Sequence, residues 1–292
     1  MKTILITGGT GRIGSCIAEG LNQTGEYRVL RGTRQASSED LIHLEYRDTE
    51  QLCRVFSENR VDVIIHMAYH LRNDDFLENH VDQNLKNAYY LYEAARKAGV
   101  KRVIFGSSNH VFGFYEKGED IRSDSAYRPD GPYALSKVFV EVLGRYYSDR
   151  YGLSVFNVRI GNFGGDSNEE PRDLRAARVW LSNNDCVQLM RKLIEYDENC
   201  RYLQIFGMSG NDGCYYNTSD NAVIGYEPQD NGGKYREKLK TLPVRIYNNT
   251  GIPVDVLTRH NYVGGYNNSM NIDGGFDFEF LKKIGEDYIP ED

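Results

Sequence analysis

The sequence predicts an α/β protein built on one doubly wound parallel sheet. Strand-like segments rich in Val and Ile alternate with helix-like segments over the first 160 residues. This alternation is typical of a parallel sheet with helices on both faces. A glycine-rich turn follows the first strand-like segment and opens the first helix-like one, which is the Rossmann-type arrangement. The 292 residues suffice for one such unit with a small C-terminal substrate-binding region.

The first half of the chain accounts for the sheet and its covering helices. Its strand-like segments are short and end near Gly, Asn or His, and its third helix-like segment carries a helical apolar stripe. The predicted strands are residues 2–7, 27–31, 61–67, 101–106 and 153–158. The predicted helices are residues 12–24, 49–58, 77–98 and 132–151.

The pattern changes after Gly161, where Gly, Asn, Asp and Tyr become frequent. Ser182 and Asp185 have capping-box spacing at the start of a helix, and residues 202–206 read as a strand. Strand-like pieces follow at 243–247 and 254–258. We expect a dinucleotide-binding core over 1–160. A substrate-binding cap and tail over 161–292 would be interleaved with it as one compact unit, at the carboxyl edge of the sheet.

Composition narrows the class of partner. The net charge is -7, the pI is about 5.5 and the mean hydropathy is -0.57. An acidic chain without a basic run argues against nucleic acid, and no apolar run is long enough to span a membrane. The chain opens directly into a strand without a signal peptide, and its five cysteines are scattered without a C-x-x-C. We therefore expect a cytoplasmic protein without a metal site or disulfides.

A dinucleotide site is predicted at the first turn. Gly8, Gly11 and Gly14 follow a strand and open a helix, an arrangement that places a pyrophosphate on the helix N-terminus. Arg12 and Ile13 lie within this turn.

The end of the second strand predicts which dinucleotide binds. An acid there would select NAD, but the chain has Gly32, Thr33 and Arg34. Because Arg34 could meet a 2′-phosphate, NADP is mildly favoured over NAD. The alternative is a solvated Arg34 and use of either cofactor. We expect the adenine and the nicotinamide ribose to lie against further residues, namely Glu45, Tyr46, Met67, Ala68 and Tyr69.

Tyr133 and Lys137 form the predicted catalytic pair. A Tyr-x-x-x-Lys on a helix puts phenol and ammonium on one face, one turn apart. A nearby cation lowers a tyrosine pKa, so Tyr133 is expected to act as a base near neutral pH.

With these residues in view, the chain resembles the extended short-chain dehydrogenase/reductase superfamily. Its motifs are Thr7-Gly8-x-x-Gly11-x-x-Gly14, Ser108 and Tyr133-x-x-x-Lys137, with 133 − 108 = 25 residues from Ser to Tyr. The resemblance implies that Tyr133 removes the proton of a reacting hydroxyl. It also implies that Lys137 holds the nicotinamide ribose and that Ser108 binds the reacting oxygen.

Within the superfamily, the chain is most similar to the uronate dehydrogenases over residues 1 to about 240. The similarity lies in the runs Ser107-Ser108-Asn109-His110, Arg128-Pro129-Asp130-Gly131-x-Tyr133, Arg159-Ile160-Gly161 and Arg175 ahead of Trp180-Leu181-Ser182. It implies oxidation of C1 of galacturonate or glucuronate to a lactone with NAD. Asn109, His110 and Asn162 would contact the sugar, and Arg175 its carboxylate. The chain departs from the family at Gly32, where an acid is usual, and at Leu71, where a serine is usual.

Several alternatives remain open. Arg172, Arg175 and Arg178 could form an ion-paired, solvated helix face. A phosphate or sulfonate would satisfy Arg175 as well as a carboxylate, and a neutral sugar is a further alternative. A nucleotide-sugar epimerase would regenerate its cofactor instead of releasing it reduced, and a non-catalytic sensor would tolerate Tyr133→Phe. Helices 77–98 and 132–151 match the pair that forms a homodimer interface in many relatives.

Overall fold

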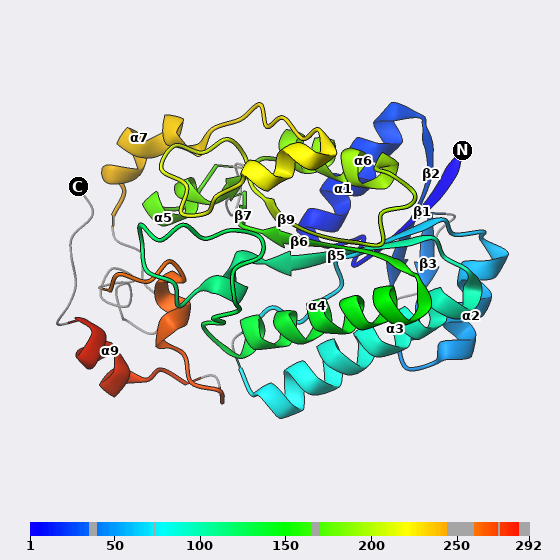
Figure 1. Cartoon of the computed structure of the whole chain (residues 1–292), viewed down its shortest axis with the longest axis horizontal. Coiled ribbons are helices and arrows are strands. Elements are labelled where there is room, and N and C mark those ends of the chain that lie inside the picture. The colour runs from blue at the N-terminus through cyan, green and yellow to red at the C-terminus, as the bar shows by residue number, and fades with distance from the viewer. Residues whose placement is uncertain (35–39, 73, 165–169, 244–259, 274, 286–292) are drawn as a thin grey trace.

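A seven-stranded parallel sheet forms the centre of the molecule, as the computed structural model in Figure 1 shows. The structure describes residues 1–34, 40–72, 74–164, 170–243, 260–273 and 275–285. The strand order is β3-β2-β1-β4-β5-β6-β9, and every neighbouring pair is parallel. The strand order reverses between β1 and β4, where α/β sheets bind ligands. The strands are β1 (Lys2–Thr7), β2 (Tyr27–Thr33), β3 (Leu41–His43), β4 (Val63–His66), β5 (Arg102–Ser108), β6 (Ser154–Ile160) and β9 (Tyr202–Gly207).

Helices cover both faces of the sheet. Ile4 and Ile6 of β1 face the core under α1 and α6, whereas Leu5 faces the core under α2, α3 and α4, because successive strand residues point to opposite faces. Figure 1 shows α1 and α6 above the sheet, with α3 and α4 below it. These helices are α1 (Arg12–Thr24), α2 (Thr49–Glu58), α3 (Lys86–Ala98), α4 (Pro132–Tyr151) and α6 (Asn183–Glu195).

The predicted fold class is confirmed, and most predicted elements lie within two residues of the observed bounds. The helix predicted over 77–98 differs, because its residues up to Leu85 belong to a π-helix (η1, Phe76–Leu85) that precedes α3. π-helical turns are rare and are often found at functional sites. Ser182 caps α6 by accepting from the Asp185 amide, as the capping-box spacing predicted. Apart from Pro243, the strand-like pieces predicted at 243–247 and 254–258 lie outside the described residues.

The second half of the chain contributes to the sheet and also gathers at one end of it. β9 extends the sheet and α6 packs against α1. Figure 1 shows α5, α7 and α9 at the end toward which β5 and β6 point. The division at residue 160 stays a prediction. The remaining elements are β7 (Asn162–Phe163), α5 (Leu174–Arg178), β8 (Trp180–Leu181), α7 (Arg236–Lys240), α9 (Phe278–Gly285) and the short helices η2 (Asn109–Phe112), η3 (Ser219–Ile224), η4 (Gly232–Tyr235) and η5 (Gly265–Ser269).

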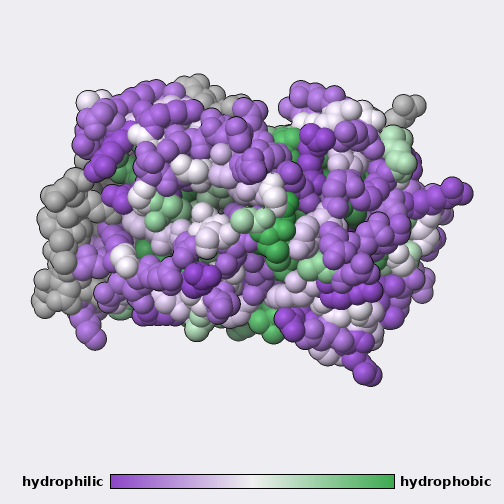
Figure 2. All heavy atoms as spheres, turned by 45° about the horizontal axis from the view of Figure 1, so that its top comes forward, coloured by the Kyte–Doolittle hydropathy of each residue, from purple (hydrophilic) through white to green (hydrophobic). Residues whose placement is uncertain are grey.

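The surface agrees with the polar composition. Figure 2 shows a mostly hydrophilic face in which apolar atoms gather in a strip near the middle. No helix among the described residues is both long and apolar enough to cross a membrane.

Candidate active site

The turn between β1 and α1 contains two glycines, Gly8 and Gly14, that a larger residue could not replace without strain. Gly8 has φ 64°, and a Cβ there would lie 2.8 Å from the Ala68 amide nitrogen. A Cβ on Gly14 would collide with the Gly8 carbonyl oxygen, whereas one on Gly11 would lie 3.3 Å from it. Gly11 caps α1 and, having no side chain, makes no capping hydrogen bond to the first amides of this helix. An uncapped helix N-terminus behind a glycine turn fits a pyrophosphate.

The end of β4 is tied to this turn through one hydroxyl. Thr7 Oγ1 accepts from the amides of Met67 and Ala68, at 3.2 Å each, and lies 2.7 Å from His66 Nδ1. Since Oγ1 accepts twice, its own hydrogen is donated to Nδ1. His66 is buried, and burial lowers its pKa to about 3. A neutral imidazole therefore fixes the position of the Met67–Ala68 backbone beside Gly8.

The residues predicted at the adenosine end lie at the ends of β2 and β3. A Cβ on Gly32 would collide with Leu44 Cδ1, so packing accounts for this glycine. Arg34 is exposed. Glu45 is exposed, whereas Tyr46 is 6% exposed and its ring centroid lies 6.4 Å from that of His66. The Tyr46 ring therefore packs in the core beneath the site.

The three residues predicted to act in catalysis lie together at the carboxyl end of the sheet. Tyr133 and Lys137 lie on the first turns of α4, which begins at Pro132, and Ser108 ends β5. The Ser108 side chain lies close enough to the Tyr133 hydroxyl to lower its pKa. Lys137 Nζ donates to the Gly106 carbonyl oxygen at 2.5 Å and lies 5.4 Å from the centroid of the Tyr133 ring.

The expected lowering of the Tyr133 pKa is wrong for the chain without ligands. Burial raises the pKa of Tyr133 to about 12; the hydrogen bond with Ser108 lowers it only in part, and the Asp130 carboxylate raises it further. Lys137 does not reverse this effect, because burial holds the pKa of its own ammonium well below the usual range. Both groups are too poorly solvated to carry charge easily.

A buried ion pair lies behind Lys137. Glu141, one turn further along α4, binds Arg159 of β6 through two hydrogen bonds of 3.1 and 2.8 Å, and both side chains are essentially inaccessible. Ser107 and Tyr127 also donate to the Glu141 carboxylate. This network joins α4 to β5 and β6, and so fixes the helix that carries the catalytic pair.

His110 is held from two sides. Its Nδ1 lies 2.6 Å from Asp130 Oδ2, and Asn267 Nδ2 lies 3.0 and 3.1 Å from the two ring nitrogens. The centroid of its ring is 6.5 Å from that of Tyr133. Asp130 Oδ1 is buried without a hydrogen-bond partner. The structure therefore places His110 beside the predicted base and adds two residues, Asp130 and Asn267, that were not predicted as site residues.

The two asparagines predicted to contact substrate differ in their surroundings. Asn109 is buried, and its Nδ2 donates to the Tyr216 hydroxyl at 3.1 Å. Asn162 follows β6, and its Oδ1 is buried without a partner. Its side chain thus retains an unused acceptor, whereas the Asn109 amide nitrogen is already bound within the protein.

Arg175 differs from its two neighbours on α5. Its Nε donates to the Val263 carbonyl oxygen at 2.8 Å, and its Nη2 is buried without a hydrogen-bond partner. Within the part of the chain that the structure describes, it forms no ion pair. Arg172 instead pairs with Asp173 at 3.5 Å, and Arg178 donates to the Gly213 carbonyl oxygen. The ion-paired helix face therefore accounts for Arg172 but not for Arg175.

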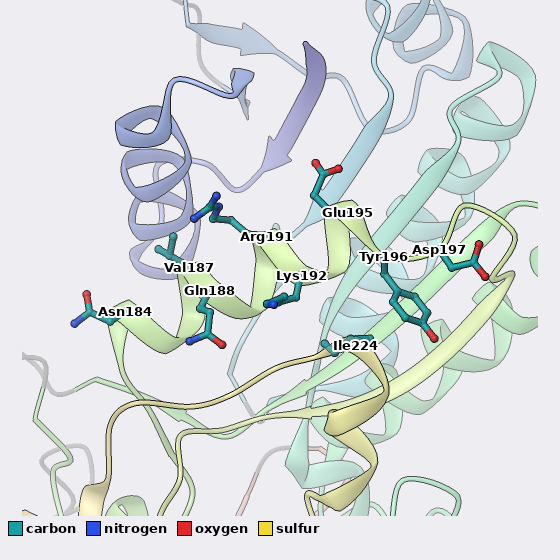
Figure 3. A pocket seen from close by; sticks show the side chains of 9 residues that line it. All are labelled: Asn184, Val187, Gln188, Arg191, Lys192, Glu195, Tyr196, Asp197 and Ile224. Atoms are coloured by element: carbon teal, nitrogen blue, oxygen red, sulfur yellow. The ribbon is translucent and has the colours of Figure 1, made fainter.

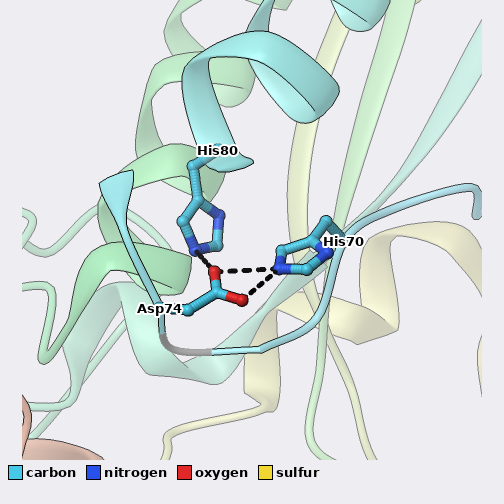
Figure 4. Close-up of side chains that lie close together, drawn as sticks. All are labelled: His70, Asp74 and His80. Carbon is cyan, nitrogen blue, oxygen red and sulfur yellow. Dashed lines mark hydrogen bonds and ion pairs between the residues drawn. The ribbon is translucent and has the colours of Figure 1, made fainter. Parts of the chain in front are cut away.

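One cluster of possible metal ligands follows β4 (Figure 4). Asp74 lies 2.8 Å from His70 Nε2 and 3.6 Å from His80 Nε2. The side-chain amide of Asn84 accepts a hydrogen bond from the His70 N–H and donates one to the His70 carbonyl oxygen. These two bonds fix which end of the amide is Nδ2, so Nδ2 donates to His80 Nδ1, at 3.0 Å. The His80 proton is then on Nε2, directed at Asp74. A metal ion would need a lone pair on Nε2, and the hydrogen there leaves none. We therefore interpret the cluster as one held by the His70–Asp74 and Asn84–His80 hydrogen bonds.

A hollow along α6 is unrelated to this site (Figure 3). Its walls include Arg191 and Glu195, and these charges are already paired with Glu26 at 2.8 Å and Lys2 at 2.6 Å. None of the predicted site residues lines it.

Sequence reasoning did not identify three residues that shape the site. Asp130 lies in the Arg128–Gly131 run, and its position three residues before Tyr133 is a signal that could have revealed it. Asn267 and Tyr216 reach the site from 157 and 107 residues away, and no local pattern marks either one.

The chain is similar to known proteins over most of its length. Residues 4–196 match the NAD dependent epimerase/dehydratase family. A uronate dehydrogenase of Pseudomonas putida is 32% identical over 82% of this chain and 88% of its own length. Two Haloferax volcanii proteins are similarly related. They are an L-arabinose 1-dehydrogenase (NAD(P)(+)), 32% identical over 79% of this chain and 98% of that protein, and an NAD-dependent glucose-6-phosphate dehydrogenase, 33% identical over 80% and 95%.

The solved structures extend the similarity to most of the fold. A mutant of the uronate dehydrogenase from Agrobacterium tumefaciens, complexed with NAD, superimposes with a TM-score of 0.77. It is 27% identical and covers 93% of this chain and 98% of its own.

Proposed function

Because the chain belongs to the NAD dependent epimerase/dehydratase family, we propose that it oxidises C1 of an acidic aldose, such as galacturonate or glucuronate, to the lactone. The three curated relatives compared above are all dehydrogenases of sugars or sugar derivatives. This chain is accordingly an NAD-dependent sugar dehydrogenase, and the proposal concerns its substrate and its catalytic residues.

Tyr133 is the proposed base. Its phenolate would remove the proton of the C1 hydroxyl, and Ser108 would donate a hydrogen bond to the same oxygen. Lys137 would stabilise the phenolate and bind the nicotinamide ribose. A bound nicotinamide ring would supply the acceptor for the hydride from C1. The hydroxyl proton thus moves to Tyr133 while the C1–H electron pair leaves the sugar.

The observation that carries the substrate proposal is the unpaired Nη2 of Arg175. A guanidinium remains charged in proteins, and a buried donor without an acceptor is costly unless a ligand supplies one. Two buried acceptors on residues described above, Asp130 Oδ1 and Asn162 Oδ1, also lack donors among the described residues. A sugar acid supplies both missing partners, because its carboxylate accepts from Arg175 and its hydroxyls can donate to the acceptors.

A sugar phosphate is the second candidate. It would satisfy the same guanidinium, and the glucose-6-phosphate dehydrogenase relative is as similar to this chain as the uronate dehydrogenase. A neutral aldose would leave Arg175 Nη2 unpaired. A neutral substrate like that of the L-arabinose 1-dehydrogenase therefore fits this site least well.

For the cofactor, we propose a mild preference for NADP within a chain that accepts NAD. The N-terminal amides of α1 and the Gly8–Gly14 turn would hold the pyrophosphate of either dinucleotide. Arg34 is exposed at the end of β2 and, within the described chain, has no ion pair that would occupy its guanidinium. Arg34→Ala should therefore weaken NADP binding and leave NAD binding nearly unchanged.

The test measures formation of reduced cofactor with galacturonate, glucuronate, glucose 6-phosphate and galactose, each with NAD and NADP. Loss of a charge-assisted hydrogen bond costs about 1.5–3 kcal/mol, so Arg175→Ala should lower kcat/KM for a uronate by about 10- to 150-fold. The variant should leave activity on galactose almost unchanged. Arg178→Ala, on the same helix, is the matched control.

The outcomes separate the candidates. Turnover of a uronate that depends on Arg175 but not on Arg178 supports the proposal. Turnover of glucose 6-phosphate alone would move the substrate class to phosphates. A preference for galactose that persists in Arg175→Ala would exclude an anion subsite. Conversion of a nucleotide sugar without net release of reduced cofactor would indicate an epimerase.

A further inference from the structure

We propose that Tyr69 is a positioning residue that stabilises the charged form of Lys137 through the face of its aromatic ring. The catalytic meaning of this contact rests on the proposed function, but the contact itself can be tested without substrate or cofactor. Tyr69 is one of the residues expected to line the cofactor site, and its ring has a separate role.

The surroundings of Lys137 contain little else that stabilises a cation. Its Nζ lies 3.3 Å from the centroid of the Tyr69 ring and 4.6 Å from that of Phe105, and it donates one hydrogen bond, to the Gly106 carbonyl oxygen. The side chain is 3% exposed and forms no ion pair within the described residues. A desolvated ammonium over an aromatic face is stabilised by the ring quadrupole, and this contact is stronger in a buried site than at the surface.

The Tyr69 ring is fixed in the orientation that this contact needs. Its hydroxyl donates to Ser136 Oγ at 3.0 Å, and Ser136 donates to the Tyr133 carbonyl oxygen at 2.7 Å. The ring meets that of Tyr133 edge-on, with centroids 6.0 Å apart and an interplanar angle of 85°. Ser136 Oγ also lies 3.2 Å from Nδ1 of His80, one of the two histidines of the cluster in Figure 4. The Tyr69 side chain thus contacts both members of the predicted Tyr133–Lys137 pair.

Other titratable groups near Lys137 also interact with its charge. Glu141 raises the pKa of Lys137, in opposition to burial. The positive charge of Lys137 in turn lowers the pKa of both His66 and His80. All of these groups remain in place when only residue 69 is changed, so a change in the Lys137 titration reports on the ring.

A purely structural role predicts a different result from a cation–π role. If Tyr69 only fills space, any side chain that packs there should leave the Lys137 titration unchanged. If the ring face stabilises the charge, the titration should follow the ring electronics. Tyr69→Phe keeps the ring and loses the hydroxyl, Tyr69→Leu loses the ring, and pentafluorophenylalanine at position 69 keeps the shape but withdraws the negative charge of the face.

The measurement is the pH titration of lysine ¹³Cε resonances in the ligand-free protein, with Lys137 assigned by its loss in Lys137→Arg. We expect the midpoint to be retained in Tyr69→Phe. In Tyr69→Leu and the fluorinated variant it should fall by about one pH unit, the size expected for a desolvated cation–π contact. Equal midpoints in the phenylalanine and pentafluorophenylalanine proteins would overturn the proposal, even if the leucine variant does not fold.

A second readout links the contact to turnover of whichever sugar is oxidised. Loss of the Lys137 charge removes the support for the Tyr133 phenolate, so the alkaline limb of kcat/KM should move to lower pH with pentafluorophenylalanine but not with phenylalanine. A shifted NMR midpoint in a protein that oxidises no uronate would keep this inference and reject the substrate proposal. Uronate turnover with an unshifted midpoint would do the reverse.

Discussion

Burial changes the ionisation of three side chains that meet at the carboxyl end of the sheet. The pKa of Tyr133 is raised to about 12, that of Lys137 is lowered and that of His66 is lowered to about 3. Each shift favours the neutral form, because removal from water penalises charge. Before ligands bind, the site is therefore a low-dielectric environment, in which one added charge or dipole strongly changes the pKa values of these groups.

His66 gives this environment a measurable consequence for stability. Its folded pKa is depressed from about 6.5, so its contribution is present above that pH and is lost as the pH falls toward 3. The free energy of unfolding should decrease below pH 6.5 by up to about 1.4 kcal/mol per pH unit from this group. His66→Asn retains an acceptor for Thr7 and removes the titration, so urea unfolding between pH 4 and 7.5 should show a shallower slope.

The exposed His43 supplies the control for this experiment. His43→Asn should keep the slope of the unmodified protein. His260, whose pKa burial lowers to about 4, contributes in the same direction and remains in both variants. An unchanged slope in His66→Asn would mean that His66 already titrates normally in the folded chain.

At the residue scale, the sequence could predict side chains that lie within one turn or one motif of each other. The Gly8–Gly14 turn and the Tyr133–Lys137 spacing are of this kind. The Tyr69 ring reaches Ser136 across 67 residues, and Val263 reaches Arg175 across 88, so no local pattern reveals them. The predicted direction of the Tyr133 pKa shift was wrong for the same reason, because the shift depends on desolvation by residues distant in the chain.

At the scale of elements, the β1–α1 turn separates two kinds of glycine. A Cβ at Gly14 would collide with the Gly8 carbonyl oxygen, whereas at Gly11 it would meet only that oxygen, at 3.3 Å. Gly14→Ala should lower the free energy of unfolding by about 1–3 kcal/mol, because the helix must shift from the turn. Gly11→Ala should fold with nearly normal stability. Urea midpoints compare the two proteins directly.

The same pair tests the cofactor assignment of the turn. Gly11→Ala should weaken dinucleotide binding in a calorimetric titration despite its near-normal stability, because its methyl group would lie where the phosphate is expected to approach. Normal binding by Gly11→Ala would place the pyrophosphate elsewhere. Normal stability of Gly14→Ala would show that the turn yields more easily than its geometry indicates.

The π-helix η1 shows why element type was harder to predict than element position. The apolar pattern of residues 77–98 continues smoothly into α3, and the sequence predicted one helix. The widened first part places His80 and Asn84 so that both contact the loop after β4, through the His70 backbone and Asp74. Tertiary hydrogen bonds of this kind accompany the departure from α-helical geometry. They cannot be predicted from the spacing of apolar residues in the sequence.

At the scale of the whole molecule, the tail answers a question that the sequence left open. The segment 260–273 packs onto the predicted site, because the amides of Val263 and Gly264 donate to the Tyr115 and Gly113 carbonyl oxygens and Asn267 contacts His110. The site is therefore assembled from both ends of the chain, although the similarity in motifs was confined to its first 240 residues.

The outer face of α4 carries the last prediction, that the molecule forms a homodimer. Four apolar side chains, at positions 135, 139, 142 and 146, follow one helix face and are 36–53% exposed. Tyr89 of α3 is also half exposed. Such a stripe is costly in water, and a second copy would cover it.

Phe139→Asp or Val142→Asp should produce a monomer in size-exclusion chromatography with light scattering. Val223→Asp, at an equally exposed site on η3, should not, and a monomeric parent protein at all concentrations would contradict the prediction.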